Sequence, residues 1–213
     1  MSMLCTLSQV KTLLGISEQD TSQDDKLTLY IKMASAKIEG YVGYRFARGE
    51  YTEELHSTND RQLIQLNHFP LQSVSSVTAN GVPVEDYKIF PEYARWGRLY
   101  RGNGWSGNVY TRGFTYDIVA GVWNISVSYV AGYFLPNDTG YVEGAENSLP
   151  YDIVTLCMEM VQMKFNYEQM GAIGIKSHSE GHISESYGDD STDVGLTESA
   201  KLMLNKYVWY GVA

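Results

Sequence analysis

The sequence predicts an α+β protein in which the N- and C-terminal regions form a helical bundle that carries an inserted antiparallel β-sandwich or barrel-like domain. Apolar residues recur at spacings of three and four near both ends of the 213-residue chain, as they do on one face of a helix. Between these ends the helical spacing disappears, and glycine, threonine, tyrosine and valine predominate. We therefore expect a discontinuous helical domain of residues 1–47 and 148–213 and a β domain of residues 48–147.

Two helices are expected in the N-terminal region. Thr6 and Gln9 have the spacing of a capping box, and the short helix that they open ends at Gly15. A second start signal at Thr21–Ser22 precedes a long helix that ends at Gly43. The apolar residues of the long helix form one stripe, which we expect to face the core. They are Leu27, Tyr30, Ile31, Ala34, Ile38, Tyr41 and Val42.

Short strands joined by turns are expected in the central region. Asn80-Gly81 separates two β-like runs, and this pair favours a type I′ hairpin turn, which needs positive φ at both central residues. In "NISVSYVAGY", residues 124–133, polar and apolar residues alternate as in a half-buried strand. "RGNGWSGNVYTRG", residues 101–113, is expected to be a glycine-rich loop between strands, and it lacks the pattern of a phosphate-binding loop.

The C-terminal region returns to helical spacing. Pro150 and Asp152 fit the first turn of a helix that continues to about Gly171, and Thr197 suits the N-cap of a last helix. The connection between these helices, "GIKSHSEGHISESYGDD" at residues 174–190, is longer than a bundle loop needs. Its alternating residues suit an extended chain, and we expect an arm or hairpin that contacts a neighbouring subunit.

The same connection contains residue types found in active sites, but without the spacing that their chemistry requires. Ser179 lacks the first glycine of the G-x-S-x-G turn of serine hydrolases. His178 and His182 would lie more than about 10 Å apart on an extended strand, too far to share one metal ion. In the β region, His56 and His68 have no partner at ligand spacing. We predict no enzymatic activity, no metal and no cofactor.

Charge and cysteine content restrict the partners that the protein can bind and the redox compartment in which it is made. A formal net charge of −9 argues against gripping nucleic acid through its phosphates, although it suits a wall past which DNA slides. Cys5 and Cys157 are far apart in the sequence and lie beside apolar residues, so we expect buried free thiols and synthesis in the cytosol. The N-terminus lacks the basic segment and long apolar run of a signal peptide.

Several short patterns in the two helical regions occur in the order seen in one family. The N-terminal patterns are "V-K-x-x-L-G-I" at residues 10–16, an acidic turn at Asp24-Asp25, and an aromatic-glycine-arginine-aromatic signature within residues 41–46. The C-terminal patterns are "L-P-x-D-I" at residues 149–153 and "G-I-x-S-x-S-x-G-x-x-S-x-S-Y" at residues 174–187. Together they resemble the head–tail connector (adaptor) proteins of tailed bacteriophages. The shorter members of that family lack most of the β region.

This resemblance implies a virion structural protein at the head–tail interface, made in the cytoplasm of the bacterial host. It implies a homo-oligomeric ring, usually of twelve copies, that sits under the portal protein, extends the DNA channel and docks the next neck or tail-completion protein. DNA would pass through without sequence-specific binding. The residues that we expect at subunit or portal interfaces lie in the long connection and near the C-terminus. They are Ile175, Ser177, Ser179, Ile183, Ser186, Tyr187, Tyr207, Trp209 and Tyr210.

Besides a distant interpretation as an uncharacterised hydrolase, which a serine-directed probe would test, two alternatives stay open from the sequence. The first is a recognition module that binds carbohydrate or protein through exposed aromatic residues of the β domain, such as Trp96, Trp105 and Tyr110. The second concerns Trp209 and Tyr210 alone, which suit packing within the chain as well as docking to a partner.

Overall fold

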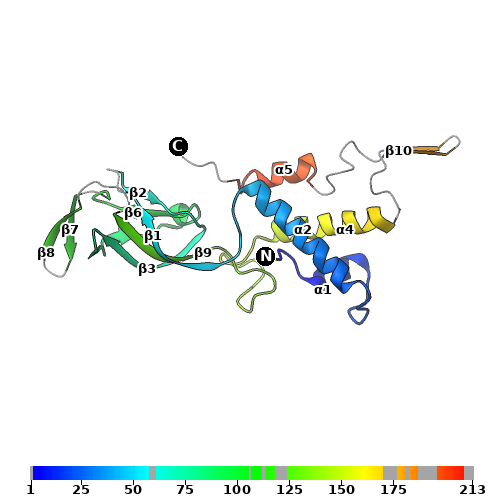
Figure 1. Cartoon of the computed structure of the whole chain (residues 1–213), viewed down its shortest axis with the longest axis horizontal. Coiled ribbons are helices and arrows are strands. Elements are labelled where there is room, and N and C mark those ends of the chain that lie inside the picture. The colour runs from blue at the N-terminus through cyan, green and yellow to red at the C-terminus, as the bar shows by residue number, and fades with distance from the viewer. Residues whose placement is uncertain are drawn as a thin grey trace. The chain divides into compact units, whose positions relative to one another are not determined.

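The structure is a computed structural model of the chain, and it consists of two compact units (Figure 1). The helical unit comprises residues 1–45 and 134–213, and the β unit comprises residues 46–133. The residues that the structure describes are 2–57, 61–105, 107–111, 114–118, 124–169, 177–180, 183–186 and 196–208.

The described part of the helical unit contains four helices, two from each end of the chain. The bounds of α1, α2, α4 and α5 are Leu7–Leu14, Asp24–Val42, Tyr151–Gln169 and Glu198–Leu204. α2 contacts the other three helices, and Figure 1 shows it lying across α4. The N- and C-terminal regions therefore share one helical core, although nearly ninety residues of the β unit separate them in the sequence.

The predicted capping box opens α1. The Gln9 amide donates to the Thr6 hydroxyl (3.0 Å), and the Thr6 amide donates to the Gln9 side chain (2.8 Å). Gly15 ends the helix in the left-handed conformation that glycine adopts without steric cost. Both ends of α1 thus lie where the sequence signals place them.

α2 ends as predicted but begins two residues later than expected. Gly43 closes the helix with a φ of 85°. At the other end, Gln23 is the cap residue and makes no side-chain cap hydrogen bond, so the predicted start at Thr21–Ser22 is wrong. Asp24 and Asp25 still occupy the first turn, where their charge complements the helix dipole.

The predicted apolar stripe of α2 faces the core of the helical unit. Tyr41 is only half-buried, and its hydroxyl donates to the Asn205 side chain just beyond α5 (2.8 Å). The other six residues of the stripe are buried. They are Leu27, Tyr30, Ile31, Ala34, Ile38 and Val42.

A buried ion pair joins α1 to the start of α2. The Lys11 side chain is only 2% exposed, and its ammonium lies 2.6 Å from a carboxylate oxygen of Asp24. The same ammonium donates to the Glu18 carbonyl in the intervening turn (3.3 Å). Because a buried lysine is costly without such partners, this pairing fixes the turn between the two helices.

The segment between the β unit and α4 belongs to the helical unit, although we expected the β domain to continue to residue 147. The Phe134 amide donates to the Asn147 carbonyl (2.9 Å), and the Leu149 amide donates to the Phe134 carbonyl (2.9 Å). These bonds close residues 135–147 into a loop whose two ends meet just before α4.

Three antiparallel sheets make up the described part of the β unit. The four-stranded sheet has the order β1-β9-β3-β4, the three-stranded sheet has the order β2-β6-β5, and β7 pairs with β8. The described strands form no closed barrel, so the barrel-like alternative is wrong. The elements in chain order are β1 Gly49–His56, β2 Leu63–Gln65, β3 Leu71–Ala79, β4 Val82–Pro83, β5 Tyr87–Lys88, α3 Pro91–Ala94, β6 Arg98–Arg101, β7 Gly107–Thr111, β8 Phe114–Ile118 and β9 Ile125–Ala131.

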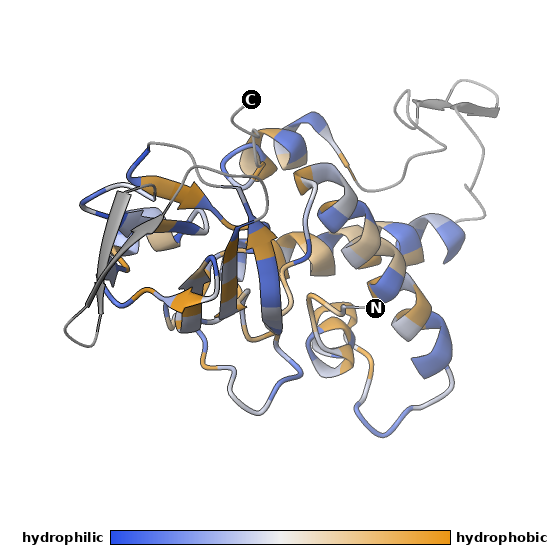
Figure 2. Cartoon of the chain, turned by 60° about the vertical axis from the view of Figure 1, so that its left-hand side comes forward, coloured by the Kyte–Doolittle hydropathy of each residue, from blue (hydrophilic) through white to orange (hydrophobic). Residues whose placement is uncertain are grey.

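The four-stranded and three-stranded sheets contribute to one hydrophobic core. In β9, Ile125, Val127 and Tyr129 are buried while Ser126 and Ser128 are half-buried, which confirms the predicted alternation. Figure 2 shows hydrophobic and hydrophilic residues interleaved along the strands. The buried residues of this core are Ile64, Leu66, Leu71, Val77, Ala79, Val84, Ala94, Leu99, Trp105, Ile125, Val127, Tyr129 and Ala131.

One predicted turn is confirmed and one predicted loop is partly wrong. Asn80 and Gly81 connect β3 to β4 with φ values of 50° and 78°, the two positive values that a type I′ turn needs. Residues 101–113 are not a single loop, because Arg101 ends β6 and Gly107–Thr111 forms β7. The strand was not predicted because it is only five residues long and glycines surround it in the sequence.

The first and last strands of the β unit pair with each other. β1 is antiparallel to β9, with Gly49 opposite Ala131. Beyond the strands, Ala47 and Tyr133 form an isolated bridge that is parallel, in which the Tyr133 amide donates to the Phe46 carbonyl (2.7 Å) and the Arg48 amide donates to the Tyr133 carbonyl (2.9 Å). The chain therefore enters and leaves the β unit at the same place.

Gly132 is required at this point, and we predict that Gly132→Ala destabilises the β unit. Its φ is +96°, and an added Cβ would lie 2.5 Å from the Ala47 carbonyl oxygen. Strain and overlap together should lower the free energy of unfolding by about 3 kcal/mol in urea denaturation.

Gly81→Ala is the matched control. Gly81 also has a positive φ, but nothing lies within 4 Å of an added Cβ. It should cost only about 1 kcal/mol, the conformational part of the effect. Equal losses in the two variants would show that the close approach to Ala47 is unimportant.

Candidate functional site

The predicted arm contains a two-stranded hairpin between α4 and α5. β10 spans Ser177–Glu180 and β11 spans Ile183–Ser186, and the strands are antiparallel with Ser177 opposite Ser186. The described hairpin pairs with no other described strand. Four predicted interface residues lie on it, Ser177, Ser179, Ile183 and Ser186.

Of the remaining predicted interface residues, the structure describes only Tyr207. Ile175, Tyr187, Trp209 and Tyr210 lie outside the described residues. Tyr207 is buried, and its hydroxyl donates to the Asp152 carboxylate in the first turn of α4 (2.9 Å). The ring of Tyr207 therefore contributes chiefly to packing within the helical unit.

α2 carries a second row of residues, which faces solvent and which the sequence analysis missed. Leu29 and Met33 are 55% and 45% exposed, and Ala36 and Gly40 continue the row. Spacings of four, three and four place all four residues on one side of the helix. We call this row the α2 outer face. Lys32 and Lys37 lie on either side of it by helical geometry.

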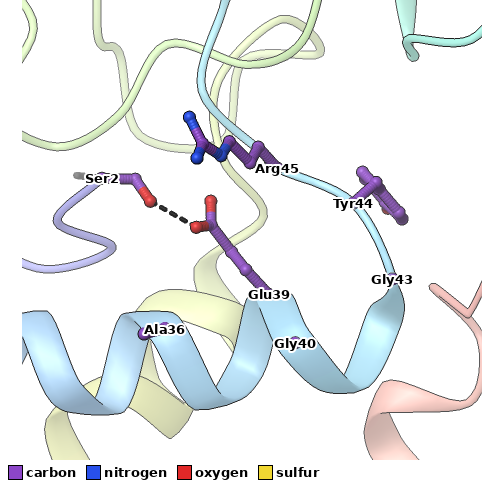
Figure 3. A pocket seen from close by; sticks show the side chains of 7 residues that line it. All are labelled: Ser2, Ala36, Glu39, Gly40, Gly43, Tyr44 and Arg45. Carbon is purple, nitrogen blue, oxygen red and sulfur yellow. Dashed lines mark hydrogen bonds between the residues drawn. The ribbon is translucent and has the colours of Figure 1, made fainter.

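A pocket of about 460 Å³ adjoins the C-terminal end of the α2 outer face. Ala36 and Gly40 form part of its lining (Figure 3). The Ser2 hydroxyl donates to the Glu39 carboxylate (2.6 Å), and Arg45 extends its guanidinium toward the same side. The apolar row thus ends at a hollow whose lining includes the polar side chains of Ser2, Glu39 and Arg45.

Of the aromatic residues predicted to form an exposed recognition surface, the structure describes the side chains of Trp96 and Trp105, while that of Tyr110 lies outside the described residues. Trp105 is fully buried, and its indole N–H donates to the carbonyls of Gln62 (3.2 Å) and Leu99 (3.3 Å). The expectation that Trp105 is exposed is therefore wrong. Trp96 is half-buried, with its ring centroid 6.4 Å from that of Phe69.

A β-bulge in β1 turns the side chain of Glu54 toward the inside of the β unit. Tyr51 pairs with Tyr129 and Glu54 pairs with Val127, so β1 has one more residue than β9 across this interval. Glu53 lies in the bulge with a φ of 53°. The side chain of Glu54 is consequently only 12% exposed.

The Glu54 carboxylate contacts both His56 and His68, the two histidines that have no partner at ligand spacing in the sequence. One carboxylate oxygen lies 2.7 Å from His56 Nε2, and the other lies 3.3 Å from His68 Nδ1. The Tyr129 hydroxyl donates to Glu54 (2.7 Å), and the Asn67 amide also donates to it (3.0 Å). In the described residues, no group of three or more His, Cys, Asp or Glu side chains is placed to hold a metal ion.

The surroundings of Glu54 favour its charged form. Burial alone would raise the pKa of this carboxyl, but hydrogen bonds from His56, the Asn67 amide and Tyr129 outweigh burial and lower the pKa to about 2. Burial and the neighbouring carboxylate raise the pKa of Tyr129 well above its ordinary value. The cluster is therefore a charged hydrogen-bonded network that links β1 to β9 and to the segment at Asn67 inside the β unit.

Comparison with known proteins identifies the family. A family model of head completion proteins matches residues 3–139. The chain belongs to the head completion protein family. This finding confirms the resemblance to phage head–tail connector proteins. No curated protein matches the chain.

The fold of this head completion protein also occurs in solved particle structures. One similar chain comes from the "Neck of empty GTA particle computed with C6 symmetry"; it has a TM-score of 0.52 and 14% identity, and the match covers 100% of this chain and 95% of that one. Another comes from the "Virion of native gene transfer agent (GTA) particle"; its TM-score is 0.51 and its identity 13%, and the match covers 99% and 92% of the two chains.

The family model matches only part of the head completion protein. The matched part includes α1, α2 and the β unit, while α4 and α5 lie beyond it. The β unit is therefore within the matched region, although we expected it to be a departure from shorter connectors. Family membership makes the protein a structural protein of the virion. None of its described helices has the length and apolarity to cross a membrane.

The low pKa of Glu54 predicts how acid destabilises the β unit. Because the pKa is lower in the folded state, the stabilisation is fully present above about pH 4.5 and is lost as the pH falls toward 2. The loss should amount to about 3 kcal/mol. Denaturant unfolding at several pH values would measure it.

In Glu54→Gln, the free energy of unfolding should be lower at pH 6 and should depend less on pH between 2 and 4.5. Glu50→Gln is the matched control, because Glu50 is exposed on the same strand. An unchanged pH dependence in Glu54→Gln would contradict the role assigned to this carboxylate.

Proposed function

We propose that the protein is a head–tail adaptor that forms a homo-oligomeric ring under the portal protein, extends the DNA channel and docks the next neck or tail-completion protein. Its membership in the head completion protein family carries this proposal. The shared fold with a chain from a neck computed with C6 symmetry supports a ring, and twelve copies are compatible with that symmetry. The ring is located at the head–tail interface of the virion.

A ring requires that each subunit present two different, complementary surfaces. We assign one of them to the α2 outer face, because Leu29 and Met33 are large apolar side chains left in solvent. We assign the other to the β10–β11 hairpin, which pairs with none of the other described strands and has small polar residues that keep it soluble before assembly. Ala36 and Gly40 would let a neighbouring backbone approach α2 closely.

The charge of the protein suits a channel for DNA. A net charge of −9 supplies no excess of basic side chains to neutralise phosphates. DNA that meets an acidic wall is repelled from it and slides rather than lodges. The protein would therefore guide DNA mechanically and without sequence preference.

Met33→Glu tests the α2 outer face. The variant should remain folded, because Met33 is 45% exposed in the single chain. It should weaken ring formation at least 100-fold, because assembly would bury an unpaired charge. Electron microscopy of the protein mixed with purified portals, with native mass spectrometry, would measure this.

Leu202→Glu is the matched control, since it places the same charge at a residue of α5 that is 73% exposed and outside the proposed interface. It should assemble normally. Normal rings from Met33→Glu would exclude the α2 outer face as a subunit contact.

Removal of the hairpin tests the second surface. Deleting residues 177–187 should leave the helical unit folded, because the hairpin pairs with none of the other described strands, yet it should prevent ring formation on the portal. Replacing these residues with a glycine-serine segment of equal length controls for the connection between α4 and α5. Unimpaired assembly of the deletion on purified portals would refute the role of the arm.

A further inference from the structure

The two cysteines of the chain meet inside the helical unit. Cys5 precedes α1 and Cys157 lies in α4, 152 positions later, yet their sulfur atoms are 3.4 Å apart. Both residues are fully buried and both thiols are free. The prediction of buried free thiols is therefore confirmed, but sequence distance concealed their contact.

Three elements fix the positions of the two thiols. Ser35 of α2 is fully buried, and its hydroxyl oxygen lies 3.7 Å from the Cys157 sulfur. The same oxygen accepts a hydrogen bond from the Leu4 amide (3.0 Å), which holds the segment before α1 against α2. Cys5 is the next residue of that segment. Packing, together with the hydrogen bond from the Leu4 amide to the Ser35 hydroxyl, thus holds the two sulfur atoms in contact.

The separation of the sulfur atoms leaves no room for another atom between them. A disulfide bond needs about 2.05 Å, so the sulfur atoms must approach by roughly 1.4 Å, a shift that side-chain rotation and small movements of the Cys5 segment can supply. We propose that Cys5 and Cys157 are a modification site, at which a small-molecule disulfide such as oxidised glutathione converts the two thiols into an intramolecular disulfide bond.

The reaction balances as two thiol–disulfide exchanges. Cys157 gives its proton to solvent, and its thiolate attacks the small disulfide, forms a mixed disulfide and releases one small thiolate, which takes up a proton from solvent. The Cys5 thiol then gives its proton to solvent, attacks the Cys157 sulfur and releases the second small thiolate, which is protonated in turn. The two cysteines are oxidised by two electrons, and the small disulfide is reduced to two thiols.

The electrostatics of the pair support this order of attack. A hydrogen bond from the Cys5 thiol lowers the pKa of Cys157 despite its burial. The same hydrogen bond and burial raise the pKa of Cys5. Opening of the segment before α1 would admit the oxidant, because this segment covers Cys157 from the Cys5 side.

The bond would be a covalent cross-link within the helical unit. It would tie the segment before α1 to α4 and close a loop that contains the whole β unit. Closing so long a loop removes conformational freedom from the unfolded chain. The thiols would persist in a reducing cytoplasm and be oxidised once a particle leaves the cell. Only the expectation that oxidation follows release of the particle rests on the proposed function. The formation of the disulfide itself requires no other copy of the chain.

Oxidation of the purified full-length protein tests the proposal. After incubation with oxidised glutathione under native conditions, the intact mass should fall by two hydrogen atoms, and peptide mapping should recover a Cys5–Cys157 cross-link. The unfolding midpoint of the helical unit should rise by on the order of 10 °C and should return to its starting value with reductant.

Cys5→Ala provides the control, because it keeps Cys157 but cannot form the bond, and its unfolding midpoint should not respond to the oxidant. Two thiols that remain free in the wild-type protein would overturn the proposal. A stable glutathione adduct, a cross-link between two chains, or a closed disulfide that lowers the unfolding midpoint would overturn it as well. None of these results depends on ring formation, so failure here is distinct from failure of the adaptor function.

Discussion

The pairing of β1 with β9 is the constraint on which the rest of the fold depends. Because the first and last strands of the β unit are neighbours, Phe46 and Tyr133 are joined by a backbone hydrogen bond. The helical unit can therefore be built from two distant parts of the chain at little extra cost in conformational entropy. Gly132 makes this junction possible, since its positive φ and missing side chain let the backbone pass close to Ala47.

Each unit also contains a buried charged side chain that fixes the arrangement of the elements around it. In the helical unit, Lys11 reaches Asp24 and the Glu18 carbonyl, so the lysine of the connector-like N-terminal pattern pairs with its acidic turn. In the β unit, Glu54 accepts hydrogen bonds from several elements at once. In both cases a charge that is costly to bury is compensated in one geometry only, so it specifies the arrangement around it.

The sequence was informative where structure is decided by neighbouring residues. The capping box at Thr6, the glycine helix ends and the Asn80-Gly81 turn depend on local backbone preferences, and all lie where we predicted them. The buried stripe of α2 follows from helical spacing in the same way.

The features that the sequence did not predict depend on distant contacts. The bulge that turns Glu54 inward, the burial of Trp105 and the meeting of Cys5 with Cys157 each require the packing of elements that are far apart in the chain. The α2 outer face was missed for another reason. Ala36 and Gly40 are too weakly apolar to stand out beside the core-facing stripe of the same helix.

The interrupted helical unit also sets an order of events during synthesis. α1 and α2 leave the ribosome first, but α4, which covers the buried stripe of α2, follows only after the entire β unit has been made. The β unit has all of its strands by residue 131 and can fold while α2 still waits for its partner. The helical unit therefore matures last. A chain cut short before α4 would carry a finished β unit but no complete helical core, which would keep incomplete subunits out of a growing particle.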